Sequence, residues 1–276
     1  MKLKYNLKVT LKNIVQIIVL TILFTNVFIS ANDEIAIPKS TKQILIVITD
    51  SITATKGLLY TLERDSSSLE WKQLNLPIKV VMGRNGLGWG NGIKNPYLPK
   101  NFPQKVEGDG RSPAGIFNLT SVFGYNAKEQ MKDLKMPYIK VNEMTECIDD
   151  PTSKYYNQIV SKDKIEENDK VDWSSSEKMS QAGIYYELGV VVDYNCNPIV
   201  KNSGSCIFLH NWADSNETMA GCTGMAPEKM KEIILWLDES KNPTLIQLTK
   251  RIYYDLIEQW NLPKIKDSYI KSSENS

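Results

Sequence analysis

The feature that most constrains the fold is a series of short apolar runs, rich in β-branched residues, that turn-forming residues separate. Runs of this length and composition predict buried β-strands. They are QILIVIT (43–49), GLLYTLERD (57–65), LPIKVVMG (76–83), IYYELGVVVDY (184–194), SCIFLHNW (205–212) and TLIQLT (244–249). Only the segment that begins at Pro227 has a strong helical pattern, because proline suits the first helical position and the apolar residues after it recur at helical spacing. We therefore expect a mostly β or α+β fold with one main helix.

The 276-residue chain contains no repeat, low-complexity block or long linker. Its 42% hydrophobic and 24% charged residues are typical of a globular protein and exclude a disordered chain. We expect residues 40–250 to form a single domain. Residues 251–276 are expected to form a terminal helix over 251–260, followed by a tail.

The N-terminus has the layout of an export signal. Four lysines (Lys2, Lys4, Lys8 and Lys12) precede residues 13–32, which carry no charge, and small residues end this stretch. This pattern is typical of a secretory signal, with cleavage expected near Ala31. The uncharged stretch is also long enough for an uncleaved membrane anchor. Either interpretation predicts an exported protein of the periplasm or cell envelope, and only the uncleaved form would contact the membrane.

The charge balance and the glycine-rich loops exclude two classes of ligand. The formal net charge is only +1, whereas a nucleic-acid-binding protein usually carries a strong basic excess. The loops at 84–92 and 107–117 are rich in glycine, but neither matches a phosphate-binding motif, so we expect no nucleotide. Loops that line or support a cleft are the better interpretation.

The chemistry is expected in residues 203–225. The single histidine of the chain, His210, ends a predicted strand, and Cys222 follows twelve residues later beside Gly221. A thiol becomes a good nucleophile when an imidazole takes its proton, and backbone N–H groups in a turn can stabilise an oxyanion. Spacing alone fits this site, but it favours a structural Cys222, buried or disulfide-bonded, and a histidine of the core.

A resemblance to a known family decides between these interpretations. The segment GSCIFLHNW and the later AGCTGM are similar to the catalytic motif of the YkuD-type L,D-transpeptidases, in which a strand-borne His precedes S/T-x-G-C. The loops MGRNGLGWG and KVEGDGRSPAGIF and the segment WLDESKNPTLIQL also resemble a branch of that family, over residues 43–249 in all. The resemblance implies a β-sandwich-type catalytic domain, an exported bacterial enzyme and a peptidoglycan substrate.

The resemblance also implies a role for each site residue. Cys222 would be the nucleophile, His210 the general base, and Gly221 would form the oxyanion turn with the N–H of Cys222. The enzyme would attack the diaminopimelate carbonyl of a tetrapeptide stem, release D-Ala, and join the acyl group to the side-chain amine of a second stem. In relatives a backbone carbonyl holds the His. Thiol, imidazole and backbone amides suffice for this chemistry, so no cofactor is expected.

Two positions depart from the family pattern. Met219 stands where the family commonly has Ser or Thr, and Gly224 stands where it usually has Arg. Arg84 and Arg111, in the two glycine loops, are therefore candidates for binding the substrate, and Trp212 is a separate candidate for lining a glycan or peptide groove. The departures keep open a hydrolase, an L,D-carboxypeptidase or endopeptidase, in which water replaces the amine. A non-catalytic module that binds the cell wall is a third hypothesis.

The remaining cysteines lack the spacing of a zinc site, and with a single histidine no metal is expected. A disulfide is allowed outside the cytoplasm. The resemblance favours Cys147–Cys206, because both residues lie in family-like segments, and Cys196–Cys206 is the alternative pairing.

Overall fold

The computed structural model describes residues 37–65, 70–90, 92, 101–165 and 170–265. By its internal contacts the chain divides into residues 1–36 and residues 37–276. The predicted export signal, residues 1–31, lies outside the described residues, as does most of the predicted tail. Among the described helices, none has the length and apolar character needed to cross a membrane.

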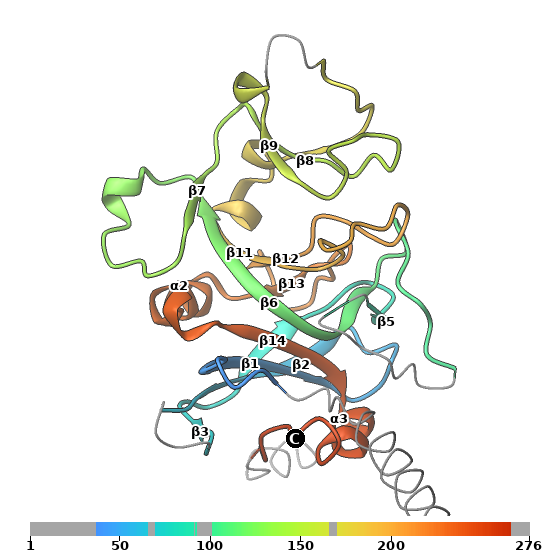
Figure 1. The fold of residues 1–276 in the computed structure, drawn as a ribbon, viewed down its shortest axis with the longest axis vertical. Coiled ribbons are helices and arrows are strands. Elements are labelled where there is room, and N and C mark those ends of the chain that lie inside the picture. Colours follow the sequence, from blue (N-terminus) through green and yellow to red (C-terminus); the bar gives the residue numbers. More distant parts are fainter. Residues whose placement is uncertain (1–36, 66–69, 91, 93–100, 166–169, 266–276) are drawn as a thin grey trace, which may run out of the picture. The chain divides into compact units, whose positions relative to one another are not determined.

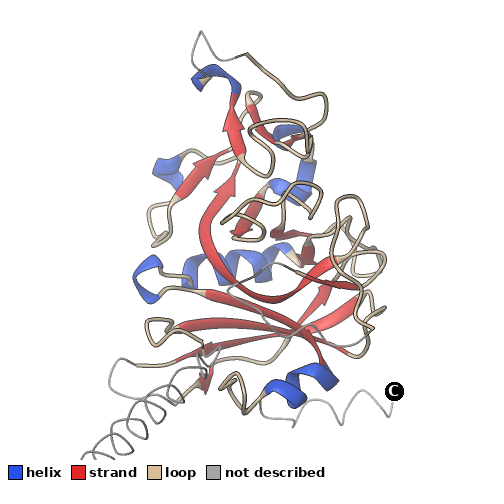
Figure 2. Cartoon of the chain, turned by 45° about the vertical axis from the view of Figure 1, so that its right-hand side comes forward, coloured by secondary structure: helices blue, strands red, loops and turns tan. Residues whose placement is uncertain are grey.

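Strands dominate the described residues, as Figure 2 shows. The strands are β1 (Gln43–Thr49), β2 (Lys56–Glu63), β3 (Lys72–Gln73), β4 (Ile78–Val81), β5 (Leu87–Trp89), β6 (Ser112–Gly124), β7 (Tyr138–Lys140), β8 (Thr145–Cys147), β9 (Ile159–Ser161), β10 (Glu177–Lys178), β11 (Leu188–Val192), β12 (Phe208–Asn211), β13 (Thr223–Met225) and β14 (Thr244–Thr249). The α-helices are α2 (Pro227–Trp236) and α3 (Lys250–Leu256). Short 3-10 turns cover Lys128–Gln130, Lys162–Lys164, Met179–Gln181, Gly183–Tyr186 and Glu239–Lys241.

The main sheet closes on itself. Its strands pair in the order β1, β14, β6, β11, β12, β13, β4 and β2, and β2 pairs again with β1 (Figure 1). Strand β1 pairs with β14 in parallel and with β2 in antiparallel register, and this second pairing joins the two ends of the strand order into a ring. The expected sandwich of two separate sheets is therefore wrong. The mostly β class is confirmed. Closure leaves no free edge among these strands.

The core lies against both faces of the closed sheet. Ile44, Ile46 and Leu59 are fully buried, and β1 is a continuous apolar run because it is covered on both sides. A buried polar bridge crosses this core beneath β13. The hydroxyl of Thr223 donates to Gln247 Oε1 at 2.7 Å, and Gln247 Nε2 donates to the carbonyl of Pro113 at 2.9 Å. The bridge thus ties together β13, β14 and β6.

The helices differ partly from expectation. Helix α2 begins at Pro227, as predicted, and buries Met230, Ile233 and Ile234. The C-terminal helix α3 ends at Leu256, earlier than predicted. The chain then turns so that Trp260 is fully buried, with its ring centroid 6.2 Å from that of Trp89. The segment after β14 is therefore part of the folded body.

A smaller sheet of β8, β9 and β10 lies beyond one end of the long strand β6 (Figures 1 and 2). The predicted strand at 184–194 begins late, because its first residues form the 3-10 turn Gly183–Tyr186 and pairing starts at Leu188. That turn contacts β12 and carries Tyr185 and Tyr186 onto the site described next.

Candidate active site

Two adjacent parallel strands bring His210 and Cys222 together. In the β12–β13 pair, Leu209 lies opposite Thr223 and His210 opposite Gly224. Cys222, one residue before Thr223, therefore lies opposite Phe208, and the N–H of Phe208 donates to its Sγ at 3.3 Å. Because side chains alternate along a strand, Phe208, His210 and Cys222 share one face of the sheet. The Cα atoms of His210 and Cys222 are separated by two residues along the strand and by one strand across, which amounts to about 8 Å. Side chains on one face of the sheet can bridge this distance.

The histidine is held in the tautomer that a general base needs. His210 Nδ1 lies 2.7 Å from the carbonyl oxygen of Asn211. A carbonyl only accepts hydrogen bonds, so Nδ1 carries the proton and Nε2 keeps its lone pair. Tyr186 packs edge-on against the imidazole with ring centroids 5.4 Å apart, and Tyr185 does so at 6.1 Å. A backbone carbonyl and two tyrosines thus orient the imidazole.

The disulfide of this structure joins Cys147 to Cys206, the pairing that the resemblance favours over Cys196–Cys206. Cys206 has a φ of 53°, which is uncommon for a residue other than glycine. Its N–H donates to Asn157 Oδ1 at 2.9 Å, and its carbonyl accepts from Cys222 Sγ at 3.4 Å. The disulfide and Asn157 therefore fix the segment that forms one wall around the thiol. Cys196 is a free thiol.

Both reacting groups are buried, and burial favours their neutral forms. Burial lowers the pKa of His210 to about 4, against a small opposing effect of the Asn211 carbonyl and Glu217. Burial raises the pKa of Cys222 well above its usual range, and the nearby Glu177 raises it further. At neutral pH the resting site therefore holds a thiol beside a neutral imidazole, not the thiolate–imidazolium pair of a pre-activated cysteine.

A carboxylate that the sequence did not single out for a role lies beside this pair. Tyr186 donates its hydroxyl hydrogen bond to Glu177 Oε2. Burial raises the pKa of Glu177 to about 7, and the charges of Asp149 and Glu107 act in the same direction. The positive charge of Lys105 acts in the opposite direction and lowers the pKa of Cys222. Lys105 is itself buried and paired with Asp109 at 2.6 Å.

The sequence matches the family of L,D-transpeptidase catalytic domains (YkuD) over residues 45–246. The chain belongs to this family. No curated protein matches it. Among solved structures it is similar to the helical cell shape determining protein Pgp2 from Campylobacter jejuni, with 13% identity and a TM-score of 0.36. That similarity covers 79% of this chain and 54% of the other, so the chain spans about half the length of Pgp2.

Three other predicted site residues of this L,D-transpeptidase domain, Gly221, Arg111 and Arg84, have surroundings that differ from those of His210 and Cys222. Gly221 lies outside the left-handed region, and a Cβ there would meet the carbonyl oxygen of Arg111 at an ordinary 3.4 Å, so space alone does not require glycine. Arg111 donates to the carbonyls of Asn85 and Leu87, which fastens the two glycine loops together. Arg84 is exposed and lies against Gly110.

Trp212 is half-buried and packs against the apolar cluster that contains Cys222. It also lines a pocket. No group of three or more His, Cys, Asp or Glu side chains in the described part of the chain could hold a metal ion.

The two departures from the family pattern occupy the same space. A Cβ on Gly224 would lie 2.6 Å from Met219 Cε and 3.0 Å from Val81 Cγ2. The thioether of Met219 thus fills the volume in which a side chain at position 224 would begin. Met219 at one position therefore accounts physically for glycine at the other.

This coupling is testable. We expect Gly224→Ala to lower the free energy of unfolding by about 1–2 kcal/mol, because the added methyl must displace a packed side chain. In a Met219→Ala background the same substitution should cost less, with a coupling energy of about 1 kcal/mol in a double-mutant cycle measured by urea unfolding. Additive effects would contradict the shared volume.

Ser112 connects the glycine loops to Cys222, a role that sequence reasoning missed. Its hydroxyl accepts from the N–H of Gly83 at 2.8 Å and donates to the carbonyl of Cys222 at 2.8 Å, and the residue is fully buried. Gly83 approaches so closely that a Cβ there would lie 2.4 Å from the carbonyl oxygen of Gly110. The two loops are therefore a support under Cys222. The only signal in the sequence was the place of Ser112 inside a family-like loop.

We expect Ser112→Ala to lower the free energy of unfolding by about 2 kcal/mol, because it leaves a buried N–H and a buried carbonyl without partners. The carbonyl of Cys222 would also lose its anchor, so acylation of the thiol should slow. Urea unfolding and mass-spectrometric acylation rates measure the two effects. Thr120→Ala, at an exposed position of the same strand β6, is the matched control and should change neither.

Proposed function

We propose that this protein is an exported peptidoglycan L,D-transpeptidase that works through a Cys222 acyl-enzyme. The observation that carries the proposal is the β12–β13 register, which sets the thiol and the Nε2 side of His210 on one face of the sheet. Membership of the L,D-transpeptidase family supplies the substrate class, the tetrapeptide stems of peptidoglycan.

In the proposed reaction the neutral imidazole of His210 takes the Sγ proton as the thiol attacks the diaminopimelate carbonyl of a stem. The C–N bond to the terminal D-Ala breaks, and the imidazolium gives its proton to the leaving amine. The side-chain amine of a second stem then attacks the thioester and loses a proton to His210. The products are a diaminopimelate–diaminopimelate crosslink and the free thiol of Cys222.

The resting electrostatics agree with a proton transfer that accompanies attack. With a pKa of about 4 the imidazole is neutral throughout the neutral range and so has a free lone pair for the Sγ proton, but in the resting site it is a weak base. The thiolate forms only when this transfer occurs, because burial and Glu177 raise the pKa of Cys222. The N–H of Cys222 is the proposed oxyanion donor.

A hydrolase on the same scaffold is the second candidate. The observation that favours it is Gly224, which Met219 covers, at the position where the family usually has Arg. With water in place of the amine, the acyl-enzyme would give a tripeptide and D-Ala.

The test is to incubate a disaccharide-tetrapeptide muropeptide with the protein lacking residues 1–31, and with its Cys222→Ala variant, and to analyse the products by mass spectrometry. A dimer formed with loss of one D-Ala, absent with the variant, would support the transpeptidase. A tripeptide monomer alone would favour the hydrolase. If neither protein changes the substrate, the proposed function is wrong. The intact mass of the protein recovered from the envelope fraction tests export and cleavage near Ala31.

A further inference from the structure

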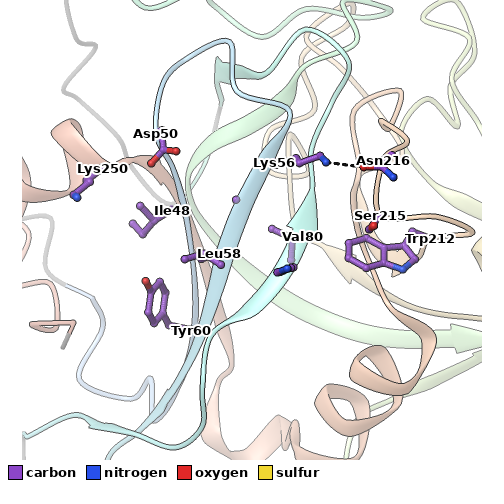
Figure 3. A pocket seen from close by; sticks show the side chains of 12 residues that line it. Ile48, Asp50, Lys56, Leu58, Tyr60, Val80, Trp212, Ser215, Asn216 and Lys250 are labelled. Carbon is purple, nitrogen blue, oxygen red and sulfur yellow. Dashed lines mark hydrogen bonds between the residues drawn. The ribbon is translucent and has the colours of Figure 1, made fainter. Parts of the chain in front are cut away.

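A pocket that none of the roles above uses opens beside Trp212. It has a volume of about 430 Å³ and extends over β1, β2 and β4 to the loop that follows β12 (Figure 3). Trp212, Ser215 and Asn216 form its wall on the loop side, and Leu58 and Ile48 lie on the sheet side, as Figure 3 shows. A neighbouring hollow shares Trp212 and Ser215 and continues to the start of α2. We call the two together the Lys–Trp groove.

The groove is positively charged. Lys56, Lys79 and Lys250 line the pocket, against the carboxylate of Asp50. None of these lysines is in a salt bridge with another described residue. The neighbouring hollow adds Lys229 and Glu232, which form a salt bridge with each other. Lys56 Nζ donates to Asn216 Oδ1 at 3.0 Å, the dashed line in Figure 3, which directs its ammonium group toward the loop. The groove is therefore suited to a ligand that carries carboxylates.

Strand register connects the groove to the reacting groups. His210 lies opposite Gly224, Gly224 opposite Val81, and Val81 opposite Lys56. Residues that lie opposite one another in a sheet project from the same face. Lys56 thus lies on the same face of the sheet as His210, three strands away around the ring.

Two further residues lie between these ends. Lys79 precedes Val81 by two residues, so it lies on the same face and nearer to β13 than Lys56 does. Trp212 lines the groove and also packs against the cluster that contains Cys222. Trp212 therefore forms a boundary that the groove shares with the apolar cluster around Cys222.

We propose that the Lys–Trp groove binds the acceptor stem, the acidic peptide whose amine attacks the thioester on Cys222. This inference rests on the proposed function. Lys56 lies two strands across and two residues along from Cys222, and an extended stem of four residues, about 13 Å long, is long enough to cover that separation. With its free carboxylates on Lys56 and Lys79, the stem would deliver its amine to the thioester, and an occupied groove would favour the amine over water.

The test separates acylation from transfer. The double variant Lys56→Gln/Lys79→Gln is compared with the unchanged protein and with Lys72→Gln, an exposed lysine on β3 outside the groove. Two rates are measured: acyl-enzyme formation from the tetrapeptide muropeptide, and dimer formation as the concentration of a disaccharide-tripeptide acceptor is raised. The tripeptide lacks the terminal D-Ala and so cannot act as a donor.

We expect the apparent KM for the tripeptide acceptor to rise about tenfold in the double variant, from the loss of charge-assisted hydrogen bonds. The acylation rate and the dimer yield at saturating acceptor should not change, and Lys72→Gln should behave as the unchanged protein. On the inactive Cys222→Ala background, the tripeptide Kd measured by calorimetry should rise equally and should depend on salt.

Three results would overturn the inference. Unchanged acceptor KM and Kd in the double variant would show that the groove does not bind this stem. A slower acylation would show that the groove serves the donor instead. If the unchanged protein acylates but yields only tripeptide at every acceptor concentration, the transferase function fails and the acceptor groove fails with it. The first two results leave the proposed function intact.

Discussion

Replacing His210 by Gln is expected to reduce kcat/KM for the tetrapeptide muropeptide by about 10³-fold. The variant keeps a polar side chain of similar size but cannot take the Sγ proton. Its deficit should shrink as the pH rises, because hydroxide then supplies the thiolate that His210 otherwise generates. Mass-spectrometric rates of acyl-enzyme formation from pH 6 to pH 10 measure this. An equal deficit at every pH would contradict the role of a base.

The same role predicts the acid limb of the pH profile. His210 can accept a proton only when neutral, and burial lowers its pKa to about 4. Because the pKa is lowered, the active form persists below the usual histidine value, and kcat/KM should fall only as the pH approaches 4. Glu177, with a pKa of about 7, titrates in the neutral range, so the profile is repeated with Glu177→Gln. The fall in kcat/KM near pH 4 should remain in the Glu177→Gln variant. A fall near pH 6.5 would contradict the inference that the imidazole of His210 is buried and neutral.

The second large effect is expected from the disulfide. Replacing Cys147 and Cys206 together by Ala should lower the free energy of unfolding by about 4 kcal/mol, because the bond closes a loop with a sequence separation of 59 residues. Activity should fall as well, since the carbonyl of Cys206 and the N–H of Phe208 both contact the Sγ of Cys222. Urea unfolding and the acylation rate measure the two effects.

The matched control is Cys196→Ala, which removes the free thiol that lines the same cavity as the disulfide. It should leave the acylation rate unchanged and should cost far less stability than the double variant. If the free energy of unfolding of the double variant is within about 1 kcal/mol of that of the unchanged protein, the disulfide does not hold the site together.

The main helix and six strands (β1, β2, β4, β11, β12 and β14) could be predicted from the sequence because their signals are local. The longest strand, β6, was missed, because it begins inside the glycine-rich segment 107–117 that was interpreted as a loop. Runs such as QILIVIT are strands in almost any context, and proline at the first position marks the start of α2. Closure of the sheet could not be predicted, because it depends on the pairing of β1 with β14, about 200 residues away. A pattern of short strands fits a sandwich and a closed sheet equally.

The two central residues of the candidate site could also be found from local sequence signals, whereas the residues around them could not. The single histidine and the glycine-flanked cysteine mark the reacting groups within one short segment, and the resemblance gave them roles. Ser112, Lys105 and Glu177 lie far from Cys222 in sequence, and nothing local distinguishes them from ordinary polar residues. Their roles depend on which loops the closed sheet brings beneath and beside the thiol.

Closure of the sheet also has a consequence for biosynthesis. The ring that holds β12 and β13 in register includes β14, which follows every other strand of the ring in the sequence and ends at Thr249. A nascent chain can hold every other strand of the ring and still lack the one that joins β1 to β6. The ring that carries His210 and Cys222 can therefore close only after β14 has been translated, so the register of the candidate site forms late in synthesis.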